Sequence, residues 1–424
     1  MAQGSGRPLE ELPVELLQAI LAAAPDIKTL KAAVMTGPCL YNAFKGAEEF
    51  IVRPVILRQF DTDLLHDVLA AHVSSKLDMS SNDHCKYKLV ERFMVPYHTR
   101  DHEYFYDFTE WKLSQALLID RLDEAVQYFV ERMATDALHV PSASGSDTPS
   151  PVLPLSKTER SRISRSLYRF HTYCTLQTGW SFVIAWSRFF APWENEQLYC
   201  IYQYLMDVVT RVLEDPNLLS NWPQHVHEGK AFINHIQFHV SLGLPHVRRL
   251  AIHNERHLQQ VVRVISETSS DDICLNFLQK DEYLAPQSQS WEGRLKYFNS
   301  EDEVRHIPRP WYHDPDSGPE DIWRWAYQEE EVRGFVGSGQ QGPLQQWVYV
   351  MWDRWRIDEW CVLVKPWLTS SRRWELYMMR QLEEQPRAID LSPQMRERLL
   401  VRRRRLGLEP NLDHWKDGFL ELSF

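Results

Sequence analysis

Residues 9–21 read Leu9-Glu10-Glu11-Leu12-Pro13-Val14-Glu15-Leu16-Leu17-Gln18-Ala19-Ile20-Leu21. The proline fits the start of a helix, because the N–H that it lacks is not used in the first turn. Four aliphatic residues then follow at helical spacing and form one apolar stripe: Leu16, Leu17, Ile20 and Leu21. Leu9 and Leu12 lie on the segment that leads into this helix. Such a stripe has to be covered, either by the rest of the chain or by a partner.

The sequence predicts a second short helix directly after the first. Asp26 stands at its start, where a carboxylate can accept backbone N–H groups of the first turn. Leu30, Ala33 and Val34 supply its apolar positions, and Gly37-Pro38 ends it. Residues 8–50 are therefore expected to form a small helical module.

This arrangement resembles the opening of an F-box, in which Leu-x-x-Leu-Pro-x-Glu-Leu-Leu is followed by a second helix. It is most similar to the F-box-like N-termini of large proteins from filamentous ascomycete fungi. In those proteins a Pro-x-Leu-Tyr-x-Ala-Phe segment, here Pro38 to Phe44, replaces the Val-Cys-x-x-Trp of the third helix. Three later segments are also similar to such fungal proteins: Leu167 to Cys174, Pro192 to Leu198, and Trp347 to Arg354.

The resemblance implies a trihelical module that docks on the Skp-type adaptor of a cullin-RING ubiquitin ligase. By position, the contact would be carried by Leu9, Leu12, Pro13, Leu16, Leu17, Ile20 and Leu21. The remaining chain would select an unknown substrate protein, so no catalysis, metal or cofactor is expected of this chain. Two alternatives stay open: a helical scaffold in which the same hairpin is internal core, and a metal-binding enzyme.

Helical periodicity continues through most of the chain. Ser156 and Glu159 have the spacing of a capping box, and the apolar positions after them lie on one helix face. Pro192 fits the first turn of another helix, which is expected to end near Asp215-Pro216. Further helices are expected at residues 63–72, 229–241, 255–267, 321–333, 344–364, 372–382 and 392–407. Few segments alternate with period two, so the predicted fold class is all-α.

The predicted organisation has four parts. The F-box-like helical module of residues 8–50 is followed by a helical continuation over residues 51–139. A linker rich in proline and serine covers residues 140–156, because its composition cannot bury a core. Residues 157–424 form a large irregular helical body, the possible substrate-binding region.

Composition narrows the classes of partner. The 424 residues carry a net charge of -11, which repels phosphate backbones, so nucleic acid is not expected as a partner. No apolar run is long enough to span a membrane, and no membrane partner is expected. Six widely spaced cysteines without a Cys-x-x-Cys pair indicate reduced thiols. The start of the sequence lacks the apolar core of a signal peptide, and these features together predict a cytoplasmic or nuclear protein.

Four further patterns could carry chemistry, and each also has a structural explanation. The pairs His98/His102, His235/His239 and His253/His257 have zinc-ligand spacing, and His225, His227 or His246 could add a third ligand to the second pair. Residues 337–342 match Gly-x-Gly-x-x-Gly without the preceding strand that a dinucleotide site needs. Arg402 to Arg405 could be a nuclear signal or the charged last turn of a helix. The tryptophans around Trp347 to Trp360 favour a packed core over a ligand groove.

Overall fold

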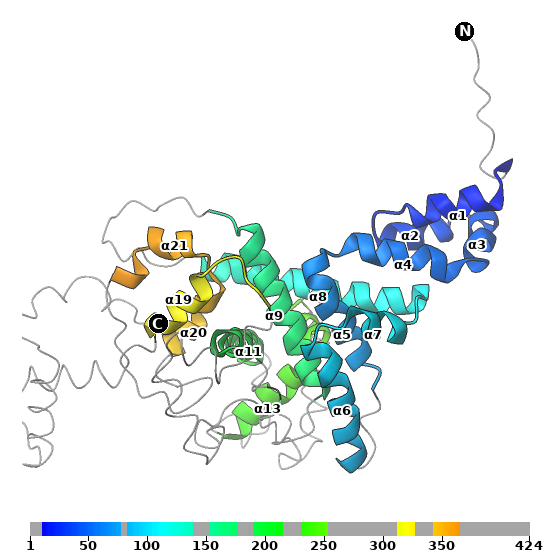
Figure 1. Ribbon diagram of the computed structural model, residues 1–424. Coiled ribbons are helices and arrows are strands. Elements are labelled where there is room, and N and C mark those ends of the chain that lie inside the picture. The colour runs from blue at the N-terminus through cyan, green and yellow to red at the C-terminus, as the bar shows by residue number, and fades with distance from the viewer. Residues whose placement is uncertain are drawn as a thin grey trace, which may run out of the picture.

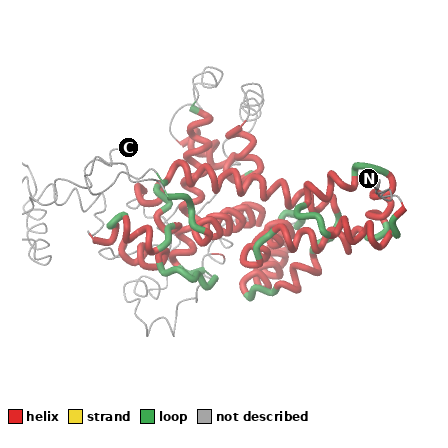
Figure 2. The backbone as a smooth tube through the Cα atoms, turned by 90° about the horizontal axis from the view of Figure 1, so that it is seen from above, coloured by secondary structure: helices red, strands yellow, loops and turns green. Residues whose placement is uncertain are grey.

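The computed structural model describes residues 11–77, 83–138, 153–176, 186, 190–214, 230–252, 312–326 and 342–364. Helices and loops make up all of these segments, and no strand occurs among them (Figure 2). The predicted all-α class is therefore confirmed for this part of the chain. The helices of the N-terminal half are α1 (Val14–Ala22), α2 (Ile27–Val34), α3 (Pro38–Lys45), α4 (Glu48–Gln59), α5 (Thr62–Ser74), α6 (Asp83–His98), α7 (His102–Phe108) and α8 (Leu113–Ala137).

Local signals in the sequence explain where the first three helices begin. Pro13 directly precedes α1, and Pro38 occupies the first turn of α3. The Asp26 side chain accepts the Thr29 N–H at 2.7 Å, and this hydrogen bond also lowers the pKa of the Asp26 carboxyl. The three helices pack on one another and on α4. They lie at one end of the molecule, far from α19 to α21 (Figure 1).

The long helix α8 connects this module to the body. Helix α8 has 25 residues. Helices α2 and α4 pack on one part of its length, and α9 and α14 pack on another part. Apolar residues of α8 that face these neighbours are fully buried, among them Ile119, Val126 and Met133. The module therefore shares a continuous helical core with the body.

The body is built around two long helices, α9 (Lys157–Leu176) and α11 (Pro192–Leu213). Helix α5 packs along α9, and α11 contacts α9, α13 (Lys230–Ser241) and α14 (Leu244–Ile252). The predicted capping box of α9 is present: Ser156 N–H donates to Glu159 at 2.9 Å, and Glu159 N–H donates to the Ser156 hydroxyl at 3.0 Å. The predicted start of α11 at Pro192 is also confirmed.

The single helix predicted for residues 344–364 is wrong. This segment forms α20 (Gly342–Gln346), a 3-10 turn at Tyr349–Met351, α21 (Arg354–Glu359) and a second 3-10 turn at Val362–Val364. Val348 and Cys361 have left-handed φ values of 50° and 55°, which interrupt a right-handed helix. Asp353 stays extended between the pieces because its N–H donates to the distant Glu159 carboxylate at 3.1 Å.

Other predicted elements fall partly or wholly outside the described residues. Helix α19 (Gly318–Ala326) covers the first half of the predicted helix 321–333. The predicted helices 255–267, 372–382 and 392–407 lie outside the described part of the chain. At the end of the predicted linker, the carbonyls of Leu153 and Pro154 accept hydrogen bonds from Arg356 at 3.2 and 2.8 Å, which ties them to the body. Over the described ranges, every helix is too short or too polar to cross a membrane.

Candidate functional site

The apolar stripe predicted for residues 16–21 divides between two faces of α1. Leu17 and Leu21 are 3% and 1% exposed and belong to the core. Leu16 and Ile20 are 50% and 48% exposed and point away from it. The outward face continues through two further apolar residues, because Ala19 and Ala23 are exposed as well. Leu16, Ala19, Ile20 and Ala23 are spaced i, i+3, i+4 and i+7, and we call them the α1 face.

The two halves of the stripe have different roles. Leu17 and Leu21 cannot touch a partner without unfolding the module, because α1 packs through them on α2, α3 and α4. Burial therefore removes Leu17 and Leu21 from the seven residues predicted to bind the partner. Leu12 is half-buried against the core, Pro13 is exposed, and Leu9 lies outside the described residues.

More apolar surface is exposed elsewhere on the same module. Four large side chains between residues 14 and 50 are also exposed: Val14 at 47%, Met35 at 74%, Tyr41 at 48% and Phe50 at 69%. Together with Leu16 and Ile20 they make six exposed large hydrophobic residues in a segment of fewer than forty. A contiguous exposed apolar patch marks an interaction site, whereas single exposed apolar residues are normal on a protein surface.

Polar contacts that the sequence pattern did not identify fix the orientation of α1. Arg58 of α4 donates to the carbonyls of Ala22 and Ala24 at 3.0 and 2.7 Å, so it caps the end of α1. The Gln18 amide donates to the Ala43 carbonyl of α3 at 3.1 Å. The α1 face is consequently presented on a braced helix and not on a loop. Arginine near a helix end is common, and nothing in the local sequence links Arg58 to α1.

The best candidate for a metal-binding pair, His235 and His239, lies in the core, and His239 is within hydrogen-bond distance of another histidine. His235 and His239 are 3% and 2% exposed, and His239 Nδ1 lies 2.9 Å from Nε2 of His246, with the two rings stacked. Burial lowers the pKa of His239 to about 3, so the His239 ring is neutral in this contact with His246. Within the described ranges, no group of three or more His, Cys, Asp or Glu side chains could hold a metal ion. The pair His253/His257 lies outside those ranges.

A buried ionic cluster joins the capping box of α9 to the C-terminal elements. Arg162 is 1% exposed and pairs with Asp314 at 2.7 Å and with Asp353 at 3.1 Å. Arg356 pairs with Glu159 at 2.7 Å, and these two residues are 2% and 0% exposed. Each of these charges has its counter-charge inside the fold, which is typical of a structural cluster and not of a reactive one.

The remaining patterns have structural roles or fall outside the described residues. The rings of Trp347, Trp352 and Trp360 lie 5.4–6.4 Å from one another, as in a packed aromatic core. Of the Gly-x-Gly-x-x-Gly segment only Gly342 is described, at the start of α20. Arg402 to Arg405 lie outside the described part.

Comparison with known proteins gives no relative from which a function could be transferred. No family model, curated protein or solved structure matches the chain.

Proposed function

We propose that this protein is an F-box-like interaction adaptor whose N-terminal module docks on a Skp-type adaptor of a cullin-RING ubiquitin ligase. The observation that carries the proposal is the exposed α1 face. A helix that presents apolar residues at i, i+3, i+4 and i+7 has the pattern used when a helix binds in a groove of another protein. The F-box-like sequence of residues 9–21 suggests which groove that is.

The construction of the module supports this proposal physically. Burial of Leu17 and Leu21 holds α1 in place, while Leu16 and Ile20 stay available for a partner. The contacts of Arg58 and Gln18 reduce the freedom of the helix before binding, so that less conformational entropy is lost when the partner docks. In this proposal the protein performs no catalysis of its own. It raises the local concentration of a bound substrate protein near the ligase.

A helical scaffold without adaptor docking is the second candidate, and one observation favours it. The module is fused to the body through α8, which α2 and α4 both contact. A hairpin that served only as internal core would have to pack on the rest of the protein in this way. It would not need Leu16 and Ile20 to be half-exposed, and this difference makes the α1 face the feature to test.

Charged substitutions on the α1 face should abolish adaptor binding. We expect the variant Leu16→Asp with Ile20→Asp to lose co-purification with a co-expressed Skp-type adaptor, because each carboxylate would be carried into an apolar interface without a partner. The loss of affinity should be at least about a hundredfold, since two desolvated anchors are removed together. The measurement is titration calorimetry with the purified adaptor, after a pull-down has identified the complex.

The matched control uses apolar residues that are equally exposed elsewhere. Leu118 on α8 and Val95 on α6 are 48% and 59% exposed, so Leu118→Asp with Val95→Asp adds the same charge to comparable positions. This control should bind the adaptor as the wild type does. The proposal fails if the wild-type protein does not bind the adaptor, or if the two double variants lose binding to the same extent.

A further inference from the structure

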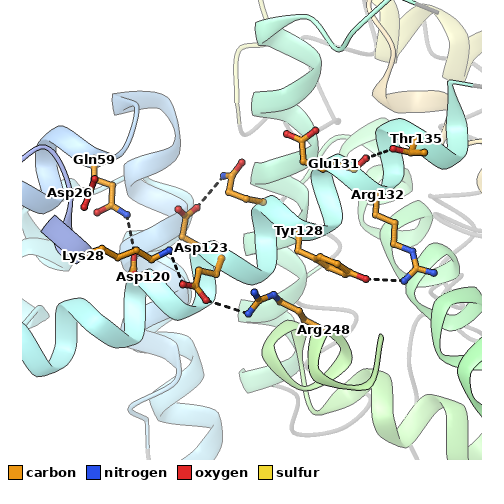
Figure 3. A pocket seen from close by; sticks show the side chains of 12 residues that line it. Asp26, Lys28, Gln59, Asp120, Asp123, Tyr128, Glu131, Arg132, Thr135 and Arg248 are labelled. Atoms are coloured by element: carbon orange, nitrogen blue, oxygen red, sulfur yellow. Dashed lines mark hydrogen bonds and ion pairs between the residues drawn. The ribbon is translucent and has the colours of Figure 1, made fainter. Parts of the chain in front are cut away.

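We draw no further inference here: the strongest candidate, the polar groove that α2, α8 and α14 line together with Gln59 of α4 (Figure 3), rests on a cluster of acidic side chains, Asp120, Asp123 and Glu124, which neighbouring side chains already bind through hydrogen bonds and ion pairs, and nothing else in the described residues points to a ligand there.

Discussion

Replacing Glu159 with glutamine is expected to lower the free energy of unfolding by about 3–5 kcal/mol, the loss typical when one partner of a buried ion pair is removed. The Arg356 guanidinium is 2% exposed and would stay buried without its counter-charge. The new amide keeps one oxygen, and its NH2 group would face either the Ser156 N–H or the Asp353 N–H, which Glu159 now accepts at 2.9 and 3.1 Å. The change in the midpoint of urea denaturation measures the effect.

A neighbouring position on the same helix provides the control for this prediction. Arg160 pairs with Glu131 at 2.7 Å, but the two side chains are 42% and 64% exposed. Removing an exposed pair changes the free energy of unfolding by about 1 kcal/mol or less, so Arg160→Ala should leave the midpoint nearly unchanged. If Glu159→Gln is as mild as Arg160→Ala, the buried pair does not hold α9 to the C-terminal elements. The double variant Glu159→Gln with Arg356→Met should regain part of the stability, because it leaves no unpaired charge.

The parts of the fold that could be predicted from the sequence are those that short segments determine. Asp26 and its hydrogen bond to Thr29 lie within four residues, as do Ser156 and Glu159. Pro192 likewise fixes the start of α11 through its own ring. The start of a helix is determined by residues that are close together in the sequence, so the sequence predicts these starts correctly.

The break within residues 344–364 could not be predicted in the same way. It depends on Asp353 and Arg356, whose partner Glu159 is 194 and 197 residues away. Helical spacing of tryptophans and aliphatic residues is compatible with one long helix, and only tertiary contacts decide against it. The same limit applies to the groove on α8, which exists because α2 and α14 approach α8 from distant parts of the sequence.

The α1 face could be predicted from the sequence only in part. The pattern of residues 16–21 predicts a helix with one apolar stripe, covered either by the rest of the chain or by a partner. The structure divides this stripe into a buried half and an exposed half. Periodicity alone could not assign Leu17 inward and Leu16 outward, because both lie within one broad apolar arc. The assignment follows from where α3 and α4 pack.

The free energy of unfolding is expected to fall steeply as the pH drops from about 6.5 towards 4. Burial lowers the pKa of His66 to about 3, of His72 to about 4 and of His239 to about 3. Below pH 6.5, the ordinary pKa of histidine, these side chains bind protons in the unfolded chain but stay neutral in the folded chain. A lower pH therefore favours the unfolded state. Each such histidine contributes up to about 1.4 kcal/mol per pH unit over that interval. Asp67 acts in the opposite sense, because burial raises its pKa and the folded state then binds a proton more readily.

A single substitution separates this histidine effect from general acid denaturation. His72 is 3% exposed, and His72→Gln removes one titrating group from the core. Its slope of unfolding free energy against pH, measured by urea denaturation at half-unit steps, should be smaller by about 1.4 kcal/mol per pH unit. A wild-type stability that is flat between pH 6.5 and 4.5 would mean that these histidines gain protons without unfolding the core around them.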